Sequence, residues 1–223
     1  MKNAVSMLML FVSCAIILGG CAGGPQEYKG LESASKLQPS ADFPHTLIYK
    51  KPGVDGKKYT KFIIDPVEIY KGEDAQFGGV PLEDQKKIAE FVKTEFTRIL
   101  QNGYAIVNAP GPDVLRLKFT LAGLEKTNPA MATVTHVIPI GLVMNLGKSA
   151  AGMNGSFMGS VTLAGELYDS QTNTLVFSFL TKKAPNAMDI TTVLTGLNAA
   201  KKSVTEMAEK FKENIDKIQK GTK

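Results

Sequence analysis

Strict alternation of apolar and polar residues over 115–121 restricts the fold of this chain more than any other feature. The residues between the apolar positions are Arg, Lys and Thr, and the apolar positions are Leu115, Leu117, Phe119 and Leu121. Because successive side chains of a strand point to opposite faces, the pattern predicts a half-buried β-strand. The alternation returns over 161–168. Turn-forming residues at 169–173 then lead to a mostly apolar stretch at 175–180, which predicts a hairpin.

Two amphipathic helices are predicted to cover the apolar face of these strands. The first begins at Pro81, carries acidic residues in its first turn and ends at Asn102-Gly103. The second begins near Asp189, whose side chain suits an N-cap. In each helix, apolar residues recur at helical spacing and mark one buried face. The face of the second helix is predicted to comprise Ile190, Val193, Leu194, Leu197, Val204, Met207, Ala208, Phe211, Ile215 and Ile218.

The order of these elements predicts an α+β fold. A strand at 62–69, interrupted by Asp65-Pro66, precedes the first helix, and a short strand at 104–107 follows it. We expect two layers, with four to five mainly antiparallel strands and the two amphipathic helices packed on one face. The predicted single domain spans residues 61–223.

The N-terminus has the pattern of a secretory signal. One positive charge precedes a run of apolar residues that is too short for a membrane span of about 20 residues. The run ends in Leu18-Gly19-Gly20-Cys21, which resembles the lipobox of bacterial lipoproteins. The resemblance implies that a signal peptidase recognises the three residues before Cys21 and removes residues 1–20. It also implies that Cys21 then carries a diacylglycerol and an acylated amino terminus.

Residues 21–60 are predicted to form a linker between this anchor and the domain. Gly, Pro, Ser, Gln and Lys recur in it, and no helical or alternating period persists. For Leu47-Ile48-Tyr49 two alternatives stay open, a short strand or docking onto the domain. Ala22 follows the cysteine, at the place where an aspartate commonly retains a lipoprotein at the inner membrane. The resemblance therefore favours a lipid-anchored protein of the outer membrane that faces the periplasm.

An apolar insert rich in Gly and Met, at 127–158, is the most unusual stretch of the predicted domain. Lys148 is its only formally charged residue. The insert is too short and too broken by glycines to cross a membrane as a helix. Two interpretations stay open: its apolar half completes the core, or it is an exposed patch for a partner, a second copy or the membrane surface. The candidate interaction patch comprises Val137, Ile138, Ile140, Leu142, Val143 and Met144.

No catalytic or cofactor-binding constellation stands out in the sequence. The only histidines are His45 and His136, and no motif of a catalytic triad or a zinc protease includes either. A run that ends in Gly-Lys-Ser at 147–149 imitates a phosphate-binding loop, but five residues separate its glycines instead of the required four. The lysine-rich C-terminal helix has acids four residues before its lysines, which is typical of a solvated face. We therefore expect no enzyme activity, no metal, no cofactor and no nucleic-acid partner.

Several short motifs resemble the bacterial lipoprotein family called domain of unknown function 3313. Together with the lipobox they are Asp65–Val67, the run from Gly111 to Leu117 and the run from Glu166 to Thr172. The resemblance covers about Leu47 to Phe211 and implies a periplasmic α+β domain, but it implies no activity. The family commonly has a glycine after the Asp-Ser-Gln-Thr turn. This chain has Asn173 there, which tolerates the same backbone conformation.

Two functions are compatible with these observations. The first is a lipid-anchored lipoprotein of the cell envelope that acts by binding or scaffolding and is held in the membrane by the lipid on Cys21. The alternative is a subunit of a membrane-associated assembly, such as a secretion or wall-synthesis complex, in which the apolar insert provides self-association or lipid contact. The expected partner is an envelope protein or a second copy of the chain.

Overall fold

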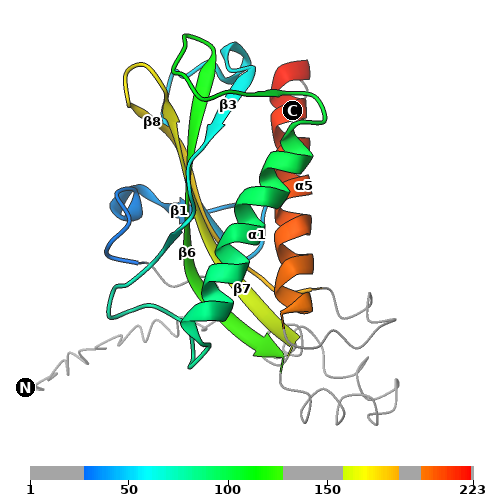
Figure 1. Ribbon diagram of the computed structural model, residues 1–223. Helices are drawn as coiled ribbons and strands as arrows, with labels where there is room; N and C mark the ends of the chain where they lie inside the picture. The colour runs from blue at the N-terminus through cyan, green and yellow to red at the C-terminus, as the bar shows by residue number, and fades with distance from the viewer. Residues whose placement is uncertain (1–27, 128–157, 186–196, 222–223) are drawn as a thin grey trace, which may run out of the picture.

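The computed structural model describes residues 28–127, 158–185 and 197–221, and Figure 1 shows a sheet with two long helices side by side. The helices are α1 (Leu82–Leu100) and α5 (Asn198–Lys220), with the short 3₁₀ turns η1 (Ala34–Lys36) and η2 (Gly56–Lys58). The strands are β1 (Gln38–Pro39), β2 (Thr46–Lys50), β3 (Lys61–Ile64), β4 (Glu68–Ile69), β5 (Ala105–Ile106), β6 (Val114–Thr127), β7 (Met158–Asp169) and β8 (Leu175–Lys183).

These strands form one mixed, eight-stranded sheet in the order β1-β2-β8-β7-β6-β3-β5, with β4 also paired to β6. Pairing is antiparallel from β1 across to β6 and parallel where β3, β4 and β5 join. The predicted α+β class is confirmed, but the predicted four to five strands are too few. β1 and β2 come from the segment predicted as a linker. The strand predicted over 62–69 forms as two strands, β3 and β4, and the short strand predicted at 104–107 forms as β5.

Asp65-Pro66 interrupts the first strand of the predicted domain, as the sequence indicates. β3 and β4 pair with the same edge of β6, on either side of the break. Proline has no N–H to donate to a ladder. The Asp65 N–H donates to the Leu117 carbonyl at 3.0 Å, and the Asp65 carboxylate accepts from Arg116 Nε at 3.1 and 3.0 Å. The break leaves β4 as a separate short strand at the rim of the sheet.

Both helices pack on one face of the sheet, as predicted (Figure 1). At the centre of this core the ring of Phe96 on α1 lies 4.4 Å from that of Phe119 on β6 and 5.7 Å from that of Phe211 on α5. The ladder between β6 and β7 shifts between Leu121 and Gly123. Because this irregularity adds a residue to β6, Leu121 and Leu124 both face the helices.

The opposite face of the sheet is covered in part by the segment that precedes β1. A second buried cluster joins Tyr28, Leu31 and Leu37 to Ala122, Ala164 and Leu180. β2 extends the sheet itself by pairing with β8 along its whole length. Residues 28–60, which composition predicts as part of a linker, therefore lie on the domain. Of the two alternatives for 47–49, the strand is the one that forms.

The C-terminal helix α5 agrees with the prediction over its described part. The predicted start near Asp189 lies outside the described residues, as do the first apolar residues of its stripe. Gly221 ends the helix with a φ of 71°, a conformation that suits glycine. Ile218, predicted to be buried, is 43% exposed because it lies in the last turn, against the backbone of Gly56. Within the described ranges, no helix is both long and apolar enough to cross a membrane.

Candidate binding groove

The site residues predicted from the sequence lie outside the described part of the chain. This holds for the lipobox, Leu18–Cys21, and for the candidate patch, Val137–Met144. The structure therefore neither brings these residues together nor separates them. A candidate site has to come from groups that the sequence did not single out.

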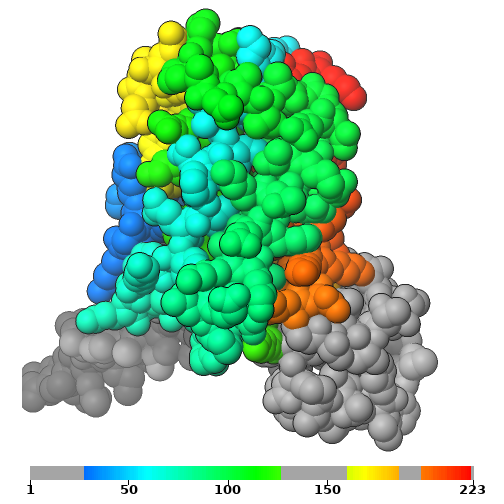
Figure 2. Space-filling model, viewed as in Figure 1, coloured from blue at the N-terminus to red at the C-terminus, as the bar shows by residue number. Residues whose placement is uncertain are grey.

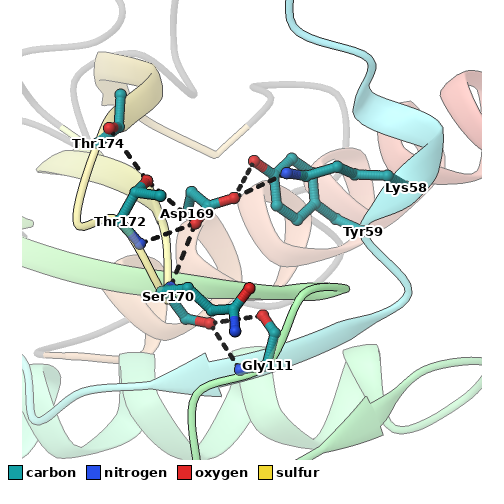
Figure 3. A network of polar contacts seen from close by, with 8 residues as sticks. Lys58, Tyr59, Gly111, Asp169, Ser170, Thr172 and Thr174 are labelled. Carbon is teal, nitrogen blue, oxygen red and sulfur yellow. Dashed lines mark hydrogen bonds and ion pairs between the residues drawn. The ribbon is translucent and has the colours of Figure 1, made fainter.

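One conspicuous polar network surrounds Asp169, the last residue of β7, before the turn to β8 (Figure 3). Asp169 Oδ2 accepts from Lys58 Nζ at 2.8 Å and from the Tyr59 hydroxyl at 3.0 Å. Its Oδ1 accepts from the Gln171 N–H at 3.2 Å, and from the Thr172 N–H and hydroxyl at 3.0 and 3.1 Å. The Lys58 ammonium, with the Thr172 and Tyr59 donors, outweighs burial and holds the pKa of Asp169 well below its usual range.

The hydrogen bonds of the Asp169 network hold parts of the fold together. A carboxylate has about four lone-pair positions, and five donors already use them here. No acceptor is left to take a proton from a substrate. The neighbouring Ser170 is engaged as well, because its hydroxyl donates to the Gly111 carbonyl at 3.0 Å and accepts from the Gly111 N–H at 3.1 Å. These bonds fasten η2 and the chain before β6 to the turn.

A groove of about 670 Å³ lies where the N-terminal segment, β4 and the start of α1 meet. Figure 2 shows this side of the molecule, with the N-terminal segment in blue beside the cyan residues around β4. Small-molecule and cofactor sites typically enclose about 300–1,000 Å³. The groove is lined by Gly30, Leu31, Glu32, Val67, Glu68, Ile69, Tyr70, Lys71, Leu82, Lys86, Lys118, Thr120 and Glu166. We refer to these residues as the β4 groove.

Two of the three carboxylates of the β4 groove, those of Glu32 and Glu166, are held in place by neighbouring donors. Glu166, which is buried, accepts from the Ser33 N–H at 2.8 Å. The Tyr168 hydroxyl donates to Glu32 at 2.8 Å and lies 3.2 Å from the second oxygen of Glu166. Burial, followed by the hydrogen bond to Glu32 and the charge of Glu166, raises the pKa of Tyr168, so the phenol stays protonated. The shared hydroxyl fixes the N-terminal segment to β7.

Three lysines, in contrast, face the β4 groove without a fixed acidic partner. Among the described residues, no carboxylate forms an ion pair with Lys71, Lys86 or Lys118. The ammonium of Lys118 instead lies 5.7 Å from the centre of the Tyr168 ring. Nearby Lys126 differs, because it pairs with Asp84 at 2.7 Å. The β4 groove therefore contains cations that are available to a ligand.

The β4 groove also follows the outer edge of β4, which pairs with no described strand. Glu68 and Ile69 lie opposite Thr120 and Leu121 of β6, so they point to opposite faces of the sheet. Ile69 packs in the helix-side core, whereas Tyr70 packs in the cluster on the other face. A groove that touches every residue from 67 to 71 must pass along the outer edge of β4.

Nothing in this arrangement forms a metal centre. Within the described ranges, no three His, Cys, Asp or Glu side chains gather closely enough to hold a metal ion. The groove combines lysines, a buried carboxylate with fixed donors and an open strand edge. This combination is suited to the recognition of a ligand. It can bind a polypeptide by backbone hydrogen bonds and by charge.

Comparison with protein families identifies the chain. The sequence model of the family described as "protein of unknown function (DUF3313)" matches residues 27–211 of the chain. The chain belongs to the DUF3313 family. The resemblance inferred from the short motifs is thereby confirmed, and the match also includes the N-terminal segment that borders the β4 groove. Among curated proteins, none matches the chain.

Several solved structures share the general arrangement of this DUF3313 protein at low similarity. The PelC dodecamer from Paraburkholderia phytofirmans is 10% identical with a TM-score of 0.41, and the match covers 74% of this chain and 94% of that one. Protein XCC0632 from Xanthomonas campestris, of family DUF330, is 10% identical with a TM-score of 0.38, over 77% and 91% of the two chains. These likenesses are too distant to carry an argument about ligand or assembly.

Sequence reasoning missed the β4 groove because its walls come from separate parts of the chain. The wall at 30–32 belongs to a segment predicted as a linker, and the floor comes from β6 and β7. One local signal did exist. Pro66 indicates a sheet edge at this point, because a proline is not tolerated inside a ladder.

Proposed function

We propose that this DUF3313 protein is a lipid-anchored protein of the bacterial cell envelope that acts by binding another protein at the β4 groove. The observation that carries the proposal is the combination of an open strand edge with unpaired lysines in one groove of about 670 Å³. The lipobox supports anchorage through an acylated Cys21. Ala22 supports the outer membrane, with the domain facing the periplasm. In this proposal the protein has no catalytic role.

Site-specific photo-crosslinking in the native host tests the proposal. A photoreactive amino acid is placed at Leu82 or at Glu68, on two different walls of the β4 groove. Position Lys93, exposed on the same helix as Leu82 but outside the groove, is the matched control. We expect the same protein, identified by mass spectrometry, to be captured from both groove positions and not from the control.

The proposal is contradicted if the groove positions capture no protein, or if the control captures the same one. Crosslinkers at Val137 and Leu142 test the alternative function in parallel. Adducts to lipid or to a second copy from these two positions alone would favour the membrane-associated assembly. Mass spectrometry of the mature N-terminus checks the anchor, since an unmodified Cys21 or an intact Met1 would contradict the proposed location.

A further inference from the structure

The backbone of β4 offers hydrogen-bonding groups toward the β4 groove. The Tyr70 N–H donates to the Leu121 carbonyl at 2.9 Å, so this group points toward β6. Backbone groups of successive residues in a strand point to opposite edges. The N–H and C=O groups of Val67, Ile69 and Lys71 therefore point outward, and no described residue pairs with them.

Among the described residues, no strand lies beside β4, whereas β5 fills the position beside β3. β5 pairs in parallel with β3, and the Val107 N–H donates to the Phe62 carbonyl at 2.9 Å. β3 and β4 lie in line along the same edge of β6. A strand added to β4 would thus continue the line of β5, and it would occupy the β4 groove.

Side chains on the two sides of this position beside β4 differ in character. On the helix side, Leu82 is 55% exposed although it is a large apolar residue. It offers a contact for an aliphatic side chain. On the other side, Lys118 lies in the groove without an ion pair to a described residue, next to Glu166, which accepts from the Ser33 N–H. An extended chain, whose side chains alternate between the two sides, can satisfy both at once.

We infer that the β4 groove binds an extended acidic peptide segment of a partner protein, which adds to the outer edge of β4 as a further strand. This inference rests on the proposed function and specifies the chemistry of the partner. Backbone pairing with 67–71 supplies affinity. Aliphatic residues contact Leu82, and acidic residues between them reach Lys118 and the flanking Lys71 and Lys86. The groove is lined by three lysines and three glutamates, so its formal charge is zero. The contacts for acidic residues are the three lysines, because none of them forms an ion pair with a described carboxylate.

The same edge resists unspecific pairing. β4 is only two residues long, and Pro66 directly before it limits the ladder. Short strands, prolines and lysines are features that keep sheet edges from aggregating. An added strand therefore depends on its side chains as well as on its backbone, which gives the groove selectivity for sequence.

Binding of a synthetic peptide to the full-length chain in detergent tests the inference. The probe is a fluorescent peptide of about nine residues in which Val and Glu alternate, within the usual length of a strand. Fluorescence anisotropy measures its affinity. Two N-methylated peptides are then compared, one methylated at the odd-numbered amides and the other at the even-numbered amides. We expect one of these two N-methylation phases to weaken binding by at least about tenfold, because it removes the hydrogen bonds to β4. The other phase should leave binding nearly unchanged, because its amides point away from β4.

Protein variants and a charge-reversed peptide complete the experiment. Leu82→Glu and Lys118→Glu are expected to weaken binding by about tenfold or more. Ile218→Glu and Lys93→Glu, which make comparable changes at exposed positions outside the groove, are expected to bind as the wild type does. A peptide of alternating Val and Lys is expected to bind at least about tenfold more weakly than the acidic one. The comparisons between peptides use the wild-type protein, so they test the inference even if a variant fails to fold.

The possible outcomes distinguish a failure of the inference from a failure of the proposed function. Equal loss in both N-methylation phases contradicts strand addition, and equal binding of the lysine peptide contradicts acidic selectivity. A dimer that forms without peptide and is lost in Leu82→Glu would make a second copy the occupant and overturn the inference. If the crosslinks at Leu82 and Glu68 appear but no peptide binds, the proposed function stands and the inference fails.

Discussion

Replacement of Asp169 with alanine is the sharpest test of how the rim of the sheet is held. The residue is 6% exposed, and its carboxylate accepts five hydrogen bonds. After the substitution, the donors in the exposed turn can form hydrogen bonds to water instead, but the hydroxyl of buried Tyr59 cannot. Loss of charged hydrogen bonds plus an unsatisfied buried hydroxyl costs about 3 kcal/mol of unfolding free energy. For a domain of this size that lowers Tm by about 6–12 °C.

The cost of Asp169→Ala should depend on pH with a definite sign. The folded-state pKa of Asp169 is depressed, whereas the unfolded-state pKa is about 3.9. Stabilisation is thus fully present at neutral pH and is lost as pH falls below about 4. Between pH 7 and pH 3, the difference in unfolding free energy between wild type and Asp169→Ala should shrink by about 1 kcal/mol. Urea unfolding followed by circular dichroism at both pH values measures it.

Two neighbouring substitutions serve as controls for Asp169→Ala. Tyr59→Phe removes only the hydroxyl and should cost about 1 kcal/mol. Lys58 contributes most to the lowered pKa of Asp169, but its side chain is 48% exposed and solvent screens the pair. Lys58→Met should therefore cost less than about 1 kcal/mol. The reasoning is refuted if Asp169→Ala costs no more than Lys58→Met, or if its cost is the same at both pH values.

Three further experiments test the packing of the core, the close approach of Gly165 to Phe179 and the lipid anchor at Cys21. Leu117→Ala, at a fully buried position, should cost about 2–5 kcal/mol in urea unfolding, whereas Leu82→Ala, 55% exposed, should cost less than about 0.5 kcal/mol. Gly165→Ala would place a methyl group against the ring of Phe179 and should cost about 1–3 kcal/mol, part of which Phe179→Leu should restore in the double variant. Cys21→Ser should move the protein from the membrane to the soluble fraction, as cell fractionation would show.

Long periodic elements were predictable from the sequence. The alternation over 115–121 predicts β6, and that over 161–168 predicts β7, because each strand has one face on the helices and one away from them. The turn before β8 was predictable too, since Asn173 adopts a φ of 52° that asparagine tolerates. α1 follows from its apolar stripe and its proline start. In each case the local pattern and the tertiary contacts agree.

The N-terminal segment could not be predicted because its stability is tertiary. Tyr28, Leu31 and Leu37 have no regular spacing, yet all three are buried on the sheet. β2 is only half-buried along its length and is fixed by pairing with β8. Such a segment looks like a linker in composition, and only the finished sheet gives it a place to pack.

The β4 groove was beyond sequence reasoning for the same reason. Its lysines are scattered over 71–118, and its wall at 30–32 is brought in by the Tyr168–Glu32 hydrogen bond at 2.8 Å. The outer edge of β4 is open because no described strand pairs with it. This depends on β5, which pairs with β3 and ends before it reaches β4. The break at Pro66 marks the position of the edge but not the groups around it.

The position of the N-terminal segment changes how far an anchor at Cys21 lets the domain reach. A linker that ran to residue 60 would allow a distance of tens of Å from the membrane. The chain is already buried at Tyr28, and the seven residues from Cys21 span at most about 25 Å. Gly30, Leu31 and Glu32 follow at once as a wall of the β4 groove. Where Cys21 carries lipid, a partner of this groove must therefore meet it close to the membrane surface.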